Sequence, residues 1–111
     1  MANADQLPRW DDERAEILVG KRVLVGITTL EADGETLVDH VQYYGVITSA
    51  HPTGGFRIDC SGILTGAERF LPPDLRGFSD AFPGEYTLRS TGEVVVNPDV
   101  LCTWNVIKPK N

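Results

Sequence analysis

Two histidines, His40 and His51, and two cysteines, Cys60 and Cys102, are the side chains of this sequence best suited to chemistry. The cysteines lie far apart, without the CxxC spacing of a zinc or redox site. Both are expected on inward faces of strands, where burial raises the pKa of a thiol and makes it a poor nucleophile. We therefore predict two buried free thiols in a reducing compartment, with a disulfide or a reactive thiol as the alternatives.

His40 is the candidate general base, because an imidazole titrates near neutral pH. Side chains alternate along a strand, so the adjacent Asp39 points to the opposite face and cannot form a dyad with it. No serine stands in a Gly-x-Ser-x-Gly elbow, and no spacing of His, Cys and carboxylates suggests a metal site. We predict no catalytic residue, no metal and no cofactor, and keep a small enzyme using His40 as the least favoured alternative.

The sequence also gives little support for binding of phosphate or nucleic acid. The glycine-rich stretch 62–66 has Ala67 where a phosphate-binding loop needs lysine. Acidic residues outnumber basic ones 16 to 10, and the net charge of −6 repels a phosphate backbone. The arginines alternate with apolar neighbours on predicted strands, which indicates a solvated or ion-paired face.

The elements that must position these residues begin with a short helix. Residues 1–9 are polar, contain a proline and show no periodicity, so we predict a flexible tail. Asp11 is the predicted N-cap, and Gly20 stands where a helix stops. The N-terminus lacks the basic start and apolar core of a secretory signal, which predicts a cytoplasmic protein.

From position 21 onward, runs rich in Val, Ile, Thr and Tyr alternate with short Gly, Pro, Asn and Asp turns. Asp33-Gly34 predicts a two-residue hairpin turn, and Gly45 a bend or bulge in the following strand. The segment 72–85 is predicted to be a loop or a single helical turn. The 111 residues suit a single domain over 10–111, mainly β, built as a small antiparallel barrel of five to six strands after a short N-terminal helix. The predicted strands are 21–31, 36–50, 56–61, 68–71, 86–90, 93–96 and 100–107.

This pattern resembles the small SH3-like and Sm-like barrels over residues 18–107. The resemblance lies in the order of a short helix, a long hairpin and a bent second strand. The stretches that carry it are Gly20-Lys21-Arg22-Val23-Leu24-Val25-Gly26 and Tyr44-Gly45-Val46-Ile47. Other stretches are similar to uncharacterised small bacterial proteins of no known activity: Phe70-Leu71-Pro72-Pro73-Asp74, Pro83-Gly84-Glu85-Tyr86 and Asn97-Pro98-Asp99. The resemblance implies a barrel fold, and for an Sm-like member RNA binding, but it supplies no functional residues.

The first hairpin is predicted to be apolar on both faces. A regular turn at Asp33-Gly34 would place Ile27 opposite His40. One face would then carry Val23, Val25, Ile27, Val38 and Tyr44, and the other Leu24, Leu30, Leu37, Val41 and Tyr43. Only one face can line a barrel, so the second needs cover from the helix, from the loop 72–85 or from another molecule.

Two aromatic rings, Phe78 and Phe82, lie in that loop beside acidic residues such as Asp80. They either plug a barrel end or form a docking surface for a basic partner, whose encounter the charge would speed. We predict a non-catalytic protein-interaction module that binds a protein partner or self-associates. The alternative is an Sm-like nucleic-acid-binding protein. The predicted binding residues are Leu24, Tyr43, Phe78, Phe82 and Asp80.

Overall fold

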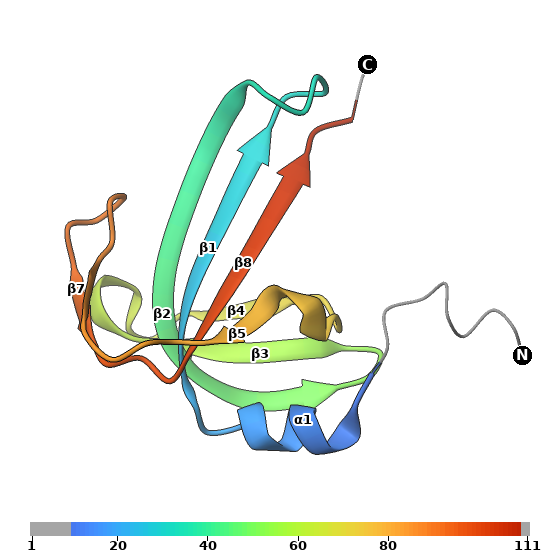
Figure 1. The fold of residues 1–111 in the computed structure, drawn as a ribbon, viewed down its shortest axis with the longest axis vertical. Coiled ribbons are helices and arrows are strands. Elements are labelled where there is room, and N and C mark those ends of the chain that lie inside the picture. Colours follow the sequence, from blue (N-terminus) through green and yellow to red (C-terminus); the bar gives the residue numbers. More distant parts are fainter. Residues whose placement is uncertain (1–9, 110–111) are drawn as a thin grey trace, which may run out of the picture.

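The computed structural model describes residues 10–109, and the tail predicted over 1–9 lies outside the described residues. Strands hold 51% of the structure and helices 13%, which confirms a mainly β class. No helix between residues 10 and 109 has the length and apolar character needed to span a membrane. The elements are α1 (Asp12–Leu18), β1 (Arg22–Leu30), β2 (Leu37–His51), β3 (Gly55–Cys60), η2 (Gly62–Leu64), β4 (Glu68–Leu71), η3 (Leu75–Gly77), β5 (Phe78–Asp80), β6 (Glu85–Thr87), β7 (Val94–Val96) and β8 (Val100–Ile107) (Figure 1).

The N-terminal helix forms where it was predicted. The Asp11 carboxylate accepts the backbone N–H of Arg14 at 3.2 Å, and so satisfies one of the free donors of the first turn. Gly20 follows the helix with a φ of 91°, a conformation that disfavours other residues. Ala15 and Leu18 are buried, because α1 lies along the curved part of β2. The helix thus closes one side of the core.

Six strands form one open sheet in the order β4-β3-β2-β1-β8-β5, and β6 and β7 form a separate hairpin. The sheet does not close into a barrel. The prediction of an antiparallel sheet is wrong at its centre, because β1 and β8 are parallel. Parallel neighbours need a long connection, and here the whole chain between the two strands provides it.

The first hairpin has a different register from the predicted one. Ile27 lies opposite Val41, not His40, and the pairing shifts between Thr29 and Leu30. The reason is local: the Asp33 carboxylate accepts the backbone N–H groups of Glu35 and Thr36, which holds a wider turn than two residues. A shift of one residue turns every side chain of a strand over, so Tyr43 faces the core in place of Tyr44.

Beyond the first hairpin, β2 bends sharply and crosses from one half of the molecule to the other (Figure 1). At Gly45, a Cβ atom would overlap the Asp59 carbonyl oxygen of β3, so only glycine permits this close approach. The bulge lies slightly further on, between Ile47 and Ser49. The prediction of an irregularity near Gly45 is correct. The close approach of β2 to β3 is at Gly45 itself, whereas the bulge lies between Ile47 and Ser49.

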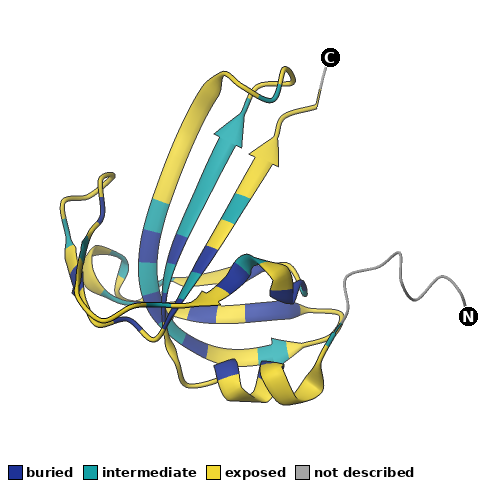
Figure 2. Cartoon of the chain, in the orientation of Figure 1, coloured by how far each residue is buried: buried dark blue, intermediate teal, exposed yellow. Residues whose placement is uncertain are grey.

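The bend divides the sheet into two regions with different surroundings. We call the first the body: α1, β3 to β7, and the parts of β1, β2 and β8 that pack against them, around buried residues such as Phe56 and Ile58. The second, which we call the arm, consists of residues 26–30, 37–42 and 103–107, and it projects away from the body (Figure 1). The radius of gyration of 14.9 Å exceeds the ~13 Å typical of a compact domain of 100 residues. Figure 2 shows that the buried positions end where the arm begins.

Candidate functional site

The residues predicted to bind a partner do not form one surface. Tyr43 and Phe78 are core residues with 3% and 4% exposure, and Leu24 is half-buried. Phe82 is 83% exposed, and Asp80 is also exposed. A docking face built on Tyr43 and Phe78 is therefore not accessible, and the binding role of the other three residues stays a prediction.

The loop predicted to carry the two aromatic rings contains a short strand. In β5, Phe78 lies opposite Cys102, which directs its ring into the core against Phe56 at a centroid distance of 4.7 Å. Trp10 stacks on the other side of this cluster, 5.4 Å from Phe56. Phe78 thus fills the plug role considered for this segment, while Phe82 remains outside and only its carbonyl is engaged, by the Tyr86 hydroxyl at 2.7 Å.

The arm exposes apolar side chains on both of its faces. On the face that continues the core, Val41 and Val106 are 42% and 47% exposed, beside the half-buried Ile27 and Trp104. The other face ends in a cross-strand row in which Leu30 lies between Leu37 and Ile107, which are 62% and 57% exposed. Apolar side chains thus stand in solvent on both faces of the same three strands.

Trp104 marks the elbow where the arm leaves the body. Its ring lies over Gly77 of η3 so closely that a Cβ there would come within 3.1 Å of the indole. The indole N–H is buried and has no acceptor among the described residues. The Trp104 ring therefore lies at the end of the core, and Val106, the next residue of β8 on this face, is exposed.

Neither edge of the arm pairs with a further strand among residues 10–109. On one side, β3 pairs with β2 only from Gly45 onward, and beside residues 37–42 lies the turn at 89–90, where the Ser90 N–H donates to the Gln42 side chain at 3.3 Å. On the other side, β5 pairs with β8 only up to Cys102, before residues 103–107. An open edge presents unpaired backbone N–H and C=O groups, which are a template for another strand.

His40 lies on the exposed edge of β2. Its Nδ1 atom is 3.0 Å from the Thr28 hydroxyl, and no carboxylate hydrogen-bonds to its ring within residues 10–109. Beside it is a hollow of about 320 Å³ lined by Leu37, His40, Arg89 and Ser90. This arrangement offers an exposed imidazole without the second group that a dyad requires.

The two cysteines are buried and unpaired, which confirms the prediction of free thiols. Burial raises the pKa of Cys102 to about 12, although the nearby Trp104 indole N–H favours the thiolate without the geometry of a full hydrogen bond. Burial likewise raises the pKa of the Cys60 thiol, and it raises that of the Tyr43 phenol between them. Neither thiol is activated as a nucleophile.

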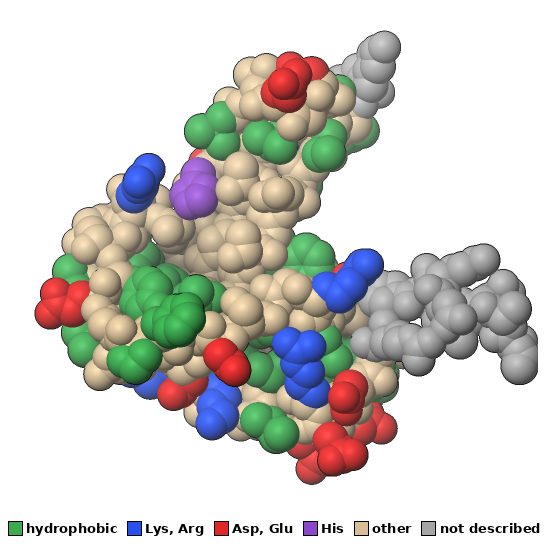
Figure 3. All heavy atoms as spheres, viewed as in Figure 1, with side chains coloured by type: hydrophobic (Ala, Val, Ile, Leu, Met, Phe, Trp, Pro, Cys, Tyr) green, Lys and Arg blue, Asp and Glu red, His purple; other side chains and the backbone are tan. Residues whose placement is uncertain are grey.

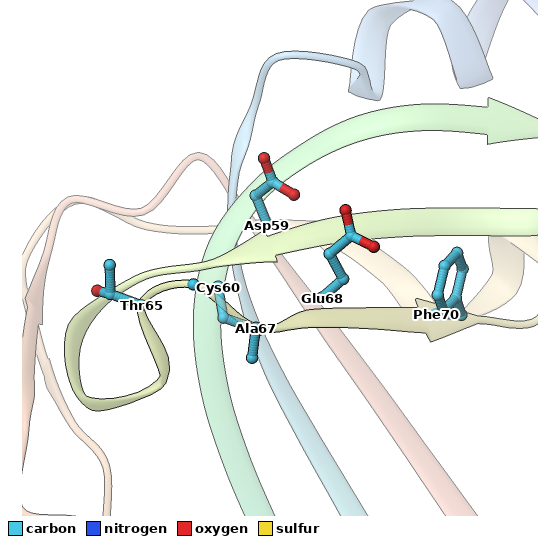
Figure 4. A pocket seen from close by; sticks show the side chains of 7 residues that line it. Asp59, Cys60, Thr65, Ala67, Glu68 and Phe70 are labelled. Carbon is cyan, nitrogen blue, oxygen red and sulfur yellow. The ribbon is translucent and has the colours of Figure 1, made fainter.

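A hollow of about 730 Å³ is lined by residues of β3, β4 and the turn between them. It lies over the β3–β4 edge, where the carboxylates of Asp59 and Glu68 point to the same side as Phe70 (Figure 4). Glu68 is paired with Arg57. The described part of the chain contains no group of three or more His, Cys, Asp or Glu side chains that could hold a metal ion.

Most of the arginines are held by groups of the same chain. Arg76 binds the Asp74 carboxylate at 2.6 Å, which lowers the pKa of that carboxyl. Arg14 donates to the Phe78 carbonyl at 3.0 Å, and Arg22 donates to the Val96 carbonyl at 2.9 Å. The visible surface mixes acidic, basic and apolar side chains without a basic stripe (Figure 3).

Sequence reasoning predicted two apolar faces for the hairpin, but the observed register places Val41 and Tyr43 on the face of Val25 and Ile27 and leaves the other face polar except near the tip. It also missed that β8 joins the hairpin: the apolar alternation of Val100, Cys102, Trp104 and Val106 indicates one shared face but not which strand lies alongside. The candidate site is therefore the arm, with one apolar face, an apolar row of Leu30, Leu37 and Ile107 on the other face, and no further strand of residues 10–109 at either edge. Comparison of the chain with models of known families, with curated proteins and with solved structures gave no match in any of the three.

Proposed function

We propose that the protein is a non-catalytic protein-interaction module that binds through its arm. The observation that carries this proposal is that three strands leave the body together with exposed apolar side chains on both faces and with no further strand of residues 10–109 paired at either edge. A patch of this kind is costly in water and typical of surfaces that a protein covers. Strand addition at an open edge is a common way to bind another protein chain.

The charges of the arm suit protein binding better than RNA binding. The turn at its tip carries Glu31, Asp33 and Glu35, and no arginine lies on its strands. Arg14, Arg22, Arg57 and Arg76 of the body are held by groups of their own chain. Sm-like nucleic-acid binding is the second candidate, supported only by the resemblance of the sequence. A salt-dependent RNA titration tests it, and absence of binding at low salt would exclude it.

We also propose a relationship to the SH3-like or Sm-like barrels and a location in a reducing compartment. A short helix packed on a strongly bent β2 supports a relationship to the SH3-like or Sm-like barrels, while the open sheet and the parallel β1–β8 pair depart from the closed antiparallel form that we expected. The two buried, unpaired thiols support a reducing compartment such as the cytoplasm.

The proposed function is tested by light scattering after size-exclusion chromatography, together with capture of partners from cell extract. The test variant is the double change Val41→Ser and Val106→Ser, which makes one arm face polar. The matched control is Ile63→Ser, because Ile63 is apolar and 67% exposed but lies in η2 of the body. We expect association or capture to be lost in the arm variant and kept in the control. A monomer that captures nothing, or capture that both variants retain, would refute the proposal.

A further inference from the structure

A small hollow lies in the body where α1 meets β5, the outermost strand on the β8 side of the sheet. The Arg14 guanidinium of α1 donates to the Phe78 carbonyl of β5 at 3.0 Å, and so ties the two elements together. The hollow that both residues line has a volume of about 230 Å³. At about 30 Å³ for each water-sized group, it holds roughly eight non-hydrogen atoms, which is the size of valine or leucine.

Part of the lining of this hollow is apolar. Leu18, Phe78 and Val100 line it and are 5%, 4% and 6% exposed, so they belong to the core. Ile17, which is 65% exposed, lines it as well. An apolar group placed here would cover these side chains and gain hydrophobic stabilisation, as in most small-molecule sites.

Four charged side chains line the same hollow, and two of them have partners. The Asp99 carboxylate accepts the backbone N–H of Arg22 at 2.8 Å, and Arg14 makes the contact with β5 described above. Lys21 and Asp80 are the other two, and neither side chain has a hydrogen bond or an ion pair among residues 10–109. An ammonium and a carboxylate that line one hollow without pairing favour a ligand that carries both charges.

The backbone of Asp80 adds a further donor and a further acceptor. The Ala81 N–H donates to the Asp99 carbonyl at 3.2 Å, so the backbone of Ala81 faces β8. By alternation the backbone of Asp80 faces away from β8, as the Phe78 carbonyl does when it accepts from Arg14. The Asp80 N–H and C=O groups therefore stand at the edge of the sheet, spaced to pair with the amino and carboxyl groups of one residue.

This stretch of edge is one residue long. Before Asp80, the Phe78 carbonyl is already engaged and the Phe78 N–H donates to the Leu75 carbonyl. After it, the Phe82 carbonyl accepts the Tyr86 hydroxyl at 2.7 Å. Strand addition by a peptide needs several free backbone groups in a row, so this edge suits one free amino acid better than a segment of a protein.

We propose that this hollow between α1 and β5, which we call the seam site, binds a free α-amino acid with a branched apolar side chain. The carboxylate of the ligand faces the Lys21 ammonium and the Asp80 N–H. The ammonium of the ligand faces the Asp80 carboxylate and carbonyl, and its side chain lies on Leu18 and Val100. The seam site lies in the body and shares no residue with the arm.

An NMR titration of the full chain with L-leucine tests the class of ligand. We expect the amide signals of Lys21 and Asp80 to shift until they saturate, while those of the arm stay in place. Isoamylamine is leucine without the carboxylate, and isocaproate is leucine without the ammonium, so each should bind about tenfold more weakly or worse. Acetyl-leucine amide has neither charge and should not bind.

Three results of this titration would overturn the proposal. The first is that leucine causes no shift at the seam site. The second is that isoamylamine or isocaproate binds as tightly as leucine, because the site would then recognise a single charge. The third is that acetyl-leucine amide binds as tightly as leucine, because the site would then recognise a peptide-like group.

Two charge variants test the assigned contacts, and both positions are exposed, so the fold should be kept. Lys21→Gln should weaken leucine binding roughly tenfold and leave isoamylamine binding unchanged, since this amine has no carboxylate to pair with Lys21. Asp80→Asn should weaken leucine binding by a similar factor and leave isocaproate binding unchanged. Circular dichroism checks that both variants fold.

The matched controls are Lys108→Gln and Asp59→Asn, which remove the same charges at exposed positions outside the seam site. Both controls should bind leucine as the wild type does. Equal losses in the controls and in the test variants would overturn the proposal, because net charge and not the seam site would then govern binding. Unchanged leucine binding in folded Lys21→Gln or Asp80→Asn would overturn it too.

Discussion

The strands β1, β2 and β8 run through both the body and the arm, but their apolar side chains are buried in the body and exposed in the arm. In the body, Val23 and Val25 of β1 are 1% and 0% exposed, because β3, β5, η3 and α1 close around them. A few residues further along the same strands, Val41 and Val106 on the face that continues the core are 42% and 47% exposed, and the turn at 89–90 approaches Leu37 and His40 on the other face. An apolar strand therefore stabilises this fold only where other elements cover it.

The difference has a consequence for energetics. Burial of an aliphatic side chain contributes ~1.5–3 kcal/mol to folding, whereas an exposed one contributes little until a partner covers it. The body therefore supplies most of the hydrophobic stabilisation of the separate chain. Substitutions at matched residues of the body and the arm test this difference in stability.

The largest difference in the free energy of unfolding is expected between substitutions at two isoleucines, one in the body and one in the arm. Ile58 of β3 is fully buried and Ile107 of β8 is 57% exposed. Ile58→Ala should lower the free energy of unfolding by about 2–5 kcal/mol, since it removes buried contacts and leaves a cavity. Ile107→Ala should change it by less than ~0.5 kcal/mol when measured on the monomer by urea denaturation. Equal losses at the two positions would mean that the arm is covered within its own chain.

The next largest difference in the free energy of unfolding is expected between alanine substitutions at two glycines. A Cβ at Gly45 meets the backbone of Asp59, while a Cβ at Gly26 on the arm finds nothing within 4 Å. Gly45→Ala should destabilise by about 1–3 kcal/mol, because the β2 and β3 backbones must separate. Gly26→Ala should be neutral or stabilise by up to ~1 kcal/mol, as expected for a glycine in an unstrained strand. A neutral Gly45→Ala would contradict the close approach at the bend.

The smallest effect concerns the tip of the arm, which is held by local hydrogen bonds. The Thr36 hydroxyl and the backbone N–H groups of Thr36 and Glu35 lower the pKa of the exposed Asp33 carboxyl to about 2, from an ordinary 3.8. Because the pKa is lower in the folded chain, the turn gains stability above the ordinary pKa and loses it as the pH falls through about 2.

Carboxyl NMR titration checks this value. Thr36→Val should raise the Asp33 pKa toward its ordinary value, while Thr29→Val, which removes a hydroxyl from the arm away from the turn, should leave it unchanged. An Asp33 pKa near 3.8 in the wild type would contradict the turn as described.

Local features were predictable because their causes lie within a few residues. The Asp11 cap, the alternation in β3 and the burial of both cysteines follow from side-chain types and strand periodicity. The register of the first hairpin was not predictable from Asp33-Gly34 alone, since the Asp33 carboxylate selects a wider turn. That one-residue shift exchanged Tyr43 for Tyr44 in the core and moved a predicted binding residue out of reach.

The mainly β class and the capped helix follow from the sequence alone, since alternation and capping are short-range properties. The tertiary structure was needed to show that β8 lies parallel to β1, that Phe78 fills the core, and that Trp104 lies at the end of the core. These outcomes depend on contacts between segments far apart in the chain, which pattern alone does not specify. The arm is exposed because its strands extend beyond the elements that cover them in the body.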